Sequence, residues 1–140
     1  MKTWVAFAIV SMVFAGLTSV IAKMGLVGIS GELGLTVRTI YVFLFVIAFA
    51  LVAVPLSDFG QLTRANYLWL GISGVTTALS WIFYYKALKE GEVSTIAIID
   101  KGSMVVAVLL AFLILKEQIT LRTIPGAALM VSGLLIIAKK

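Results

Sequence analysis

Two ionisable residues, Asp100 and Lys101, interrupt a long uncharged run that extends from Val93 to Leu115. If this run is a membrane-crossing helix, its rise of about 1.5 Å per residue places Asp100 roughly 10 Å below the helix end at Val93. A charge at that depth costs at least about 2.5 to 3.5 kcal/mol, so it faces protein or a wet cavity. We therefore predict that Asp100 and Lys101 mark a site that binds a solute or a proton.

The two side chains are not expected to neutralise each other. Neighbouring positions on a helix do not face each other, so Lys101 is a poor partner for Asp100. Asp100 then needs a cation from another helix, or a proton. The residues that carry this chemistry must therefore come from several elements.

The composition excludes most catalytic and metal chemistry. The 140-residue chain has no cysteine and no histidine, which removes disulfides, thiolate metal sites, a Cys nucleophile and Ser-His-Asp catalysis. With no phosphate-binding loop or metal-ligand cluster either, we expect no enzyme activity, no metal and no cofactor. The net charge of +5 does not indicate nucleic acid, because the basic residues lie between apolar runs, as at the flanks of membrane helices.

The balance of apolar and charged residues points to lipid as the solvent. The chain is 62% hydrophobic and 12% charged, whereas a soluble domain averages about 45 to 50% apolar and about 25% charged. We predict an all-α integral membrane protein of the cell (inner) membrane, with one domain over residues 1–140. Its bundle of five transmembrane helices is expected at residues 3–22, 35–56, 67–88, 93–115 and 120–138.

The first helix presents a small, weakly polar face. Its run is long enough to span and equally hydrophobic runs follow, so a signal peptide is not indicated. Ser11, Ala15 and Thr18 share one face, and Thr77 of the third helix is grouped with them. These residues either pack closely against another helix or line a cavity.

A glycine-rich turn from Gly25 to Gly34 leads to the second helix, with Ser30 as its expected N-cap. Arg38 follows one or two turns into that helix. Two roles are open for Arg38. It either extends to the lipid headgroups or serves as an inward-facing cation.

The third helix carries aromatic residues at the expected depth of Asp100. Trp81 and Tyr84 are three residues apart, so they lie on adjoining turns. Tyr84 and Tyr85 fit an interfacial aromatic belt. Trp81 lies deeper, about two turns before Lys89, so it either extends this belt or lines a cavity.

Small residues mark the fifth helix as a contact surface. Gly126 and Gly133 share one face, and Ala128 and Ser132 form a neighbouring pair four residues apart. Such spacing predicts close helix–helix contact, here between subunits.

Charged residues from four helices are expected to converge in one half of the bundle: Lys23, Arg38, Lys86, Asp100 and Lys101. They either form an ion-pair network that locks the bundle or surround a polar cavity. In that cavity Asp100 would bind a cation or a proton, or the lysines would bind a carboxylate. The surplus of cations favours an anionic or zwitterionic solute.

Five spans place the two termini on opposite sides of the membrane. The N-terminal side then carries Lys2, Arg64, Lys116 and Arg122, and the other side carries Lys23, Arg38, Lys86, Lys89, Lys101, Lys139 and Lys140. Four basic residues against seven orient the protein only weakly. Two oppositely oriented copies would rebuild the inverted repeat that is common in transporters.

Several segments resemble a known family, the five-helix EamA proteins of the drug/metabolite transporter superfamily. The segments are Phe14–Thr18, Ala22-Lys23, Val37–Thr39, Ser80–Leu88, Ile99–Lys101, Phe112–Glu117 and Gly126–Ile136. Larger members carry two such halves in inverted orientation and move metabolites by alternating access. The resemblance implies that this chain is one half, acts as a dimer, and exports or exchanges small organic solutes. Related small multidrug proteins use a glutamate in the first helix, which this chain lacks.

Three functions follow as alternatives. The leading one is a secondary transporter for an amino-acid-like, metabolite-like or drug-like solute, built as an antiparallel homodimer in the bilayer. The second is a subunit of a lipid-carrier flippase, which would need a lateral opening. The third is a non-transporting scaffold or regulatory subunit, which would tolerate apolar replacement of Asp100 and Lys86.

Overall fold

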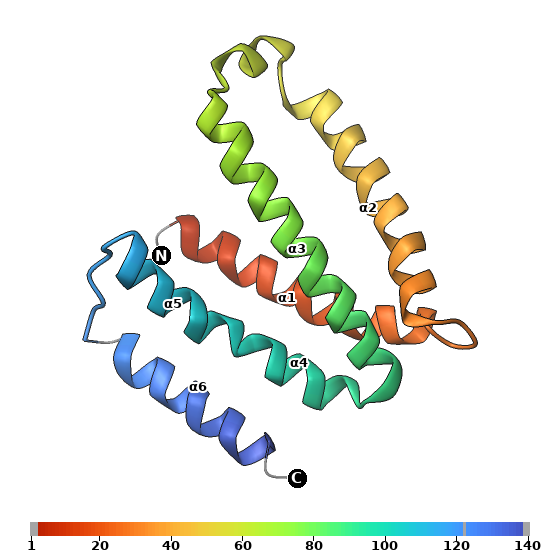
Figure 1. Cartoon of the computed structure of the whole chain (residues 1–140), viewed down its shortest axis with the longest axis vertical. Helices are drawn as coiled ribbons and strands as arrows, with labels where there is room; N and C mark the ends of the chain where they lie inside the picture. The colour runs from red at the N-terminus through yellow and green to blue at the C-terminus, as the bar shows by residue number, and fades with distance from the viewer. Residues whose placement is uncertain (1–2, 122, 139–140) are drawn as a thin grey trace. The chain divides into compact units, whose positions relative to one another are not determined.

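The computed structural model describes residues 3–121 and 123–138. Lys2, Arg122, Lys139 and Lys140, which entered the charge comparison, lie outside these residues. The helices are α1 (Thr3–Gly25), α2 (Gly31–Ala53), the 3₁₀ helix η1 (Leu56–Gln61), α3 (Arg64–Glu90), α4 (Val93–Lys101), α5 (Ser103–Ile114) and α6 (Thr123–Ala138) (Figure 1). The described residues contain no strand, so the prediction of an all-α protein is confirmed.

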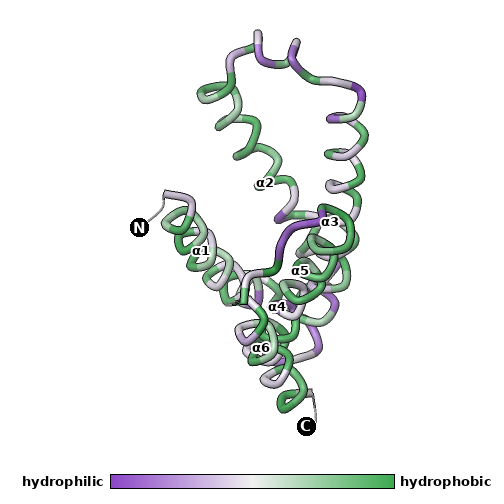
Figure 2. Tube along the Cα trace, turned by 90° about the vertical axis from the view of Figure 1, so that its left-hand side faces the viewer, coloured by the Kyte–Doolittle hydropathy of each residue, from purple (hydrophilic) through white to green (hydrophobic). Residues whose placement is uncertain are grey.

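Three helical stretches are long and apolar enough to cross a membrane: α1, α2 and the stretch Val93–Ile114 that α4 and α5 form together. The apolar helix α6 is shorter. Figure 2 shows that hydrophilic residues gather around η1, whereas α2 and α5 are hydrophobic almost throughout. By their length and composition these helices support a multi-pass membrane protein, but they do not by themselves give the predicted count of five spans.

The boundaries of α2 follow from local chemistry. The hydroxyl of Ser30 accepts a hydrogen bond from the Leu33 N–H at 3.2 Å, so the predicted N-cap is confirmed. The preceding turn uses Gly28 with φ of 77°, a conformation that glycine adopts without strain. At the other end, Val54 is extended, as expected for a residue before proline. The helix therefore begins and ends earlier than predicted.

The helix expected over residues 93–115 is divided at Gly102. The Gly102 N–H donates to the Ile99 carbonyl at 2.9 Å, and the Val105 N–H donates to the Gly102 carbonyl at 3.0 Å. These tighter 3₁₀-type turns separate α4 from α5. A Cβ at Gly102 would lie 2.9 Å from the Ile99 carbonyl oxygen and 3.0 Å from Leu134 Cδ1. The missing side chain thus permits both the tight turn and the close approach of α6.

Contacts divide the chain into two units. One comprises Val20–Glu90, and the other comprises Met1–Ser19 with Gly91–Lys140. In the second unit, α4, α5 and α6 contact one another. In the first unit, α2 and α3 form an antiparallel pair that η1 connects (Figure 1).

The close end of the α2–α3 pair is defined by a glycine. A Cβ at Gly31 would lie only 2.8 Å from the Tyr85 carbonyl oxygen, so the two backbones meet where no side chain intervenes. Leu26, Tyr85 and Leu88 are buried in the same unit. Most other large apolar side chains among the described residues are exposed. The packed centre of this unit therefore lies at the start of α2 and the end of α3.

Candidate functional site

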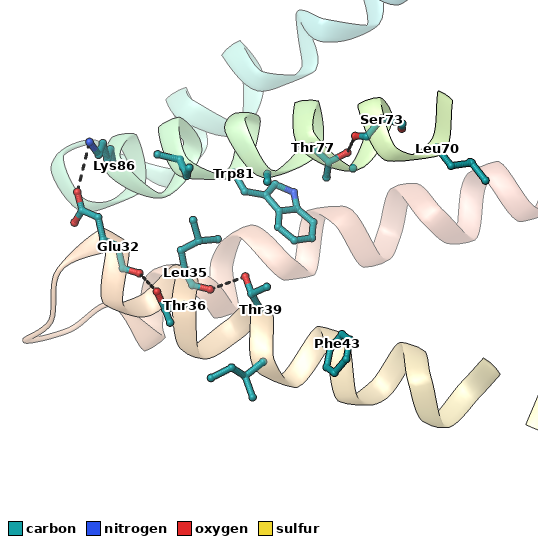
Figure 3. Close-up of a pocket in the computed structure, with 14 residues that line it drawn as sticks. Glu32, Leu35, Thr36, Thr39, Phe43, Leu70, Ser73, Thr77, Trp81 and Lys86 are labelled. Atoms are coloured by element: carbon teal, nitrogen blue, oxygen red, sulfur yellow. Dashed lines mark hydrogen bonds and ion pairs between the residues drawn. The ribbon is translucent and has the colours of Figure 1, made fainter. Parts of the chain in front are cut away.

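A cavity of about 1070 Å³ lies between α2 and α3 (Figure 3). Its lining residues recur at spacings of three and four, so each helix contributes one face. Most of the wall is apolar. The lining residues are Glu32, Leu35, Thr36, Thr39, Ile40 and Phe43 of α2, and Leu70, Ser73, Gly74, Thr77, Ala78, Trp81, Ile82 and Lys86 of α3.

An ion pair joins the two helices at one end of the cavity. Lys86 Nζ lies 3.6 Å from Glu32 Oε1, and both side chains are more than half exposed (Figure 3). Lys86 was predicted as a site residue, whereas sequence reasoning missed Glu32. Glu32 could have been identified from the sequence by its position in the first turn of a helix, where an acid is favourable. The antiparallel pairing of α2 and α3 brings that turn opposite the last turns of α3.

Three threonine hydroxyls line the cavity and bond to their own helices. Thr36 Oγ1 donates to the Glu32 carbonyl at 2.9 Å, and Thr39 Oγ1 donates to the Leu35 carbonyl at 2.8 Å. Thr77 Oγ1 donates to the Ser73 carbonyl at 2.8 Å (Figure 3). Thr77 was grouped from the sequence with a cavity or packing face, and the structure places it on the cavity wall.

The indole of Trp81 projects between the two helices and lines the cavity (Figure 3). Arg38 packs against it. The guanidinium carbon lies 4.2 Å from the centroid of the Trp81 ring and 5.8 Å from that of the Tyr85 ring. Arg38 Nη1 is buried and has no hydrogen-bond partner within the described ranges. Arg38 thus faces α3 and supports a cavity residue without lining the cavity itself.

Two lysines tie the end of α1 to the end of α3. Lys23 Nζ donates to the Leu88 carbonyl, and Lys89 Nζ donates to the Leu26 carbonyl at 3.2 Å. The last carbonyls of a helix lack intrahelical donors and carry a partial negative charge, so a lysine is favourable there. Lys23, which was predicted to bind the substrate or a proton, therefore caps the C-terminal end of α3. Of the predicted aromatic residues, Tyr84 meets Tyr85 edge to face, with 6.4 Å between ring centroids.

Asp100 and Lys101 belong to the other unit. Lys101 Nζ lies 3.5 Å from Asp100 Oδ2, so the expectation that these neighbours cannot neutralise each other is wrong. The reason is that α4 ends at Lys101, where the long, flexible lysine side chain can turn back to its neighbour. The meeting of Asp100 with the cations of the first unit stays a prediction.

The remaining predicted positions lie on α1 and α6. Ser11 and Thr18 are exposed and Ala15 is half-buried, and Thr18 Oγ1 donates to the Phe14 carbonyl at 2.8 Å. On α6, Ala128 and Ser132 are exposed, and Ser132 Oγ donates to the Ala128 carbonyl at 2.8 Å.

Gly126 and Gly133 of α6 present open surface. No heavy atom lies within 4 Å of the place where a Cβ would stand on either residue. Gly126 also borders a smaller cavity of about 280 Å³ between α5 and α6. Among the described residues, no group of three or more His, Cys, Asp or Glu side chains is placed to hold a metal ion.

The comparisons with known proteins agree with a transport role. The model of the EamA-like transporter family matches residues 2–139. A protein of Sinorhizobium sp, described as "Uncharacterized transporter in cobO 3'region", is 30% identical over 137 residues, which cover 98% of this chain and 97% of that protein. No solved structure matches the chain significantly. This chain belongs to the EamA-like transporter family, and it is a membrane transporter rather than an enzyme.

Proposed function

We propose that the protein is a secondary transporter that moves a small organic solute by alternating access, and that the α2–α3 cavity is part of the solute passage. The observation that carries this proposal is the cavity of about 1070 Å³, with an apolar wall and a charged end at Glu32 and Lys86. Pockets for small molecules enclose about 300 to 1,000 Å³ and combine apolar walls with a few polar groups. The cavity fits a metabolite-sized or drug-sized solute.

We further propose that α3 and α6 also cross the membrane, which makes five spans. At about 1.5 Å per residue, the 27 residues of α3 extend about 40 Å and the 16 residues of α6 extend about 24 Å. The hydrocarbon core measures about 30 Å, so α3 is long enough and α6 needs local thinning of the bilayer. Three of the polar residues of α3, Ser73, Thr77 and Lys86, line the cavity, where polar side chains are tolerated inside a membrane.

The working unit in this proposal is a homodimer of opposed copies. Five spans place the termini on opposite sides, and a second, inverted copy supplies the other half of an inverted repeat. The open surfaces at Gly126 and Gly133 support this arrangement, because glycines let two helix backbones approach closely. We also propose that Asp100 and Lys101, the two charges predicted to lie inside the membrane, act in the transport cycle.

The test is solute counterflow in proteoliposomes, with a panel of labelled amino acids, amines and organic acids. We expect at least one class to accumulate, and we expect Asp100→Asn and Trp81→Ala to reduce its rate. Lys116→Met serves as the control, since Lys116 lies in the link after α5. If no solute accumulates, and apolar replacements of Asp100 and Lys86 leave the stability of the protein unchanged or higher, a scaffold replaces the transporter.

Orientation is tested separately. A reporter fused to the C-terminus and read on both faces of the membrane should give signal on each face. Signal on one face alone would replace the antiparallel homodimer with a parallel or hetero-oligomeric assembly.

A further inference from the structure

The charged groups on the wall of the α2–α3 cavity offset each other. Among the described residues that line it, Glu32 is the one acid and Lys86 is the one base, and their side-chain atoms pair at 3.6 Å. Such a pair has no net charge, and water screens it because both side chains are more than half exposed. The charge preference of the cavity therefore depends on groups behind its wall.

Arg38 is a cation behind the wall that lacks a counter-ion. Its guanidinium is always ionised, and no carboxylate in the described part of the chain pairs with it. Nη1 is buried and makes no hydrogen bond within the same part of the chain. The guanidinium carbon lies 4.2 Å from the centroid of the Trp81 ring. An uncompensated positive charge thus lies directly against a ring that lines the cavity.

Trp81 presents an unused hydrogen-bond donor in this cavity. Its indole N–H donates and does not accept, and it has no partner among residues 3–121 and 123–138. Figure 3 shows the indole nitrogen on the Thr77 side of the ring. The edge of an aromatic ring is electropositive, and a cation on the ring face makes that edge more positive still. The indole edge is therefore suited to bind an anionic oxygen.

The rest of the wall offers length and apolar surface. Phe43 of α2 and Leu70 of α3 line the cavity, and α3 rises about 16 Å from Leu70 to Trp81. Ser73 also lines the cavity, but its backbone lies about 12 Å before that of Trp81 along the helix. We do not assign the Ser73 hydroxyl to the group that the indole binds. An apolar chain that extends away from the indole fits this surface.

We infer that the α2–α3 cavity selects an amphipathic carboxylate: one carboxylate oxygen accepts the Trp81 N–H, and Arg38 sets the charge preference from behind the ring. The inference rests on the proposed transport function and names its substrate class. The site is compact, because the donor on the ring edge and the cation on the ring face act on the same group. At an effective dielectric constant of about 20, unit charges within about 10 Å of each other change an affinity about tenfold. An ammonium group meets the same field as a repulsion.

Binding is measured by equilibrium dialysis of tritium-labelled probes against the full chain in nanodiscs of zwitterionic lipid, with empty nanodiscs subtracted. The probes share an apolar part and differ in charge: 4-phenylbutyrate, 4-phenylbutyramide and 4-phenylbutylamine. The amide keeps a carbonyl acceptor and lacks the charge, so the ratio of acid affinity to amide affinity reports the effect of charge. We expect the acid to bind about tenfold tighter than the amide, and the amine to bind weakest.

Variants of Arg38 separate charge from packing. Arg38→Gln removes the charge, so the acid-to-amide ratio should fall close to one. Arg38→Lys keeps the charge and loses the planar stacking surface, so both affinities should fall several-fold while their ratio is preserved. Arg64→Gln removes a cation from the first turn of α3 and is the control, which should leave the ratio unchanged.

Two tryptophans supply the matched variants for the indole donor. Trp81→Phe keeps an aromatic ring and removes the N–H, so acid binding should weaken several-fold, as for the loss of a hydrogen bond to a charged group. Trp69→Phe is the same exchange at a residue that is 68% exposed and is not part of the cavity wall. It should leave acid binding unchanged.

The inference is overturned if the amine binds as tightly as the acid, if Arg38→Gln leaves the acid-to-amide ratio unchanged, or if the two tryptophan variants behave alike. Counterflow separates this failure from failure of the proposed function. Transport of an amine or a neutral solute, at a rate that Arg38→Gln does not change, would sink the carboxylate preference and leave the transporter standing. Absence of transport for every solute in the panel would sink both.

Discussion

Arg38 holds its guanidinium carbon 4.2 Å from the centroid of the Trp81 ring. This contact joins α2 to α3, and Trp81 is at the same time a wall of the cavity. Cation–π contacts of arginine contribute about 0.5 to 1 kcal/mol at exposed sites and about 2 kcal/mol when desolvated. Arg38 Nη1 is buried, so we place this contact towards the desolvated end of that range. The position of a cavity-lining ring thus depends on a residue outside the cavity.

Replacement of Arg38 by lysine should release the Trp81 ring. Lysine keeps the charge but lacks the planar surface that stacks on an aromatic face. With Trp4 and Trp69 replaced by Phe, Trp81 is the one tryptophan left. In this background we expect the emission of Trp81 to shift to the red and solute affinity to fall several-fold. Arg64→Lys, in the first turn of α3, is the control. Unchanged emission would mean that packing other than Arg38 holds the ring.

Addition of a methyl group at Gly31 should separate α2 from α3. The new Cβ would lie 2.8 Å from the Tyr85 carbonyl oxygen, and overpacking of this kind costs about 1 to 3 kcal/mol. Thermal unfolding in detergent should show a lower midpoint for Gly31→Ala. Gly71→Ala is the matched control, because no atom lies within 4 Å of its Cβ position and alanine favours a helix by about 1 kcal/mol. Equal midpoints for the two variants would contradict the close crossing.

Loss of the lysine caps should loosen the junction of α1 with α3. Lys23→Met removes the hydrogen bond to the Leu88 carbonyl, and Lys89→Met removes the one to the Leu26 carbonyl. We expect each variant to lose about 1 kcal/mol of stability, as for a typical net hydrogen bond. Urea titration followed by circular dichroism measures the loss, with Lys116→Met as control. If both variants match this control, Lys23 becomes available again as a candidate for solute binding.

Asp100→Asn should lower the rate of counterflow without lowering stability. The change removes one charge of the Asp100–Lys101 pair, whose atoms are 3.5 Å apart and whose side chains are partly exposed, and pairs of this kind contribute about 0 to 1 kcal/mol. A transport role instead predicts a rate at least about tenfold lower, as for the loss of a charged hydrogen-bond partner. Parallel flux and unfolding measurements distinguish the two effects. An unchanged rate would remove Asp100 from the transport mechanism.

Local properties of the chain could be predicted from the sequence alone. Membrane character follows from the share of apolar residues, and the start of α2 follows from Ser30, because a cap acts within three residues of its helix. Thr77 and Trp81 could also be named as cavity candidates, since small and aromatic residues at helical spacing define a face. Such properties depend on composition and short spacings, which a sequence displays directly.

The tertiary structure decided which residues meet across helices. The pairing of Glu32 with Lys86 and the stacking of Arg38 on Trp81 depend on the register and rotation of α2 against α3. The close approach of the two backbones at Gly31 and Tyr85 limits both. Likewise, the Asp100–Lys101 pair forms where α4 ends. The rule that neighbouring helix positions do not face each other applies within a continuous helix. The sequence by itself determined a membrane protein built of apolar helices. Helix packing determined which residues line the cavity between α2 and α3, because contacts between distant residues depend on the relative placement of two helices and not on either helix alone.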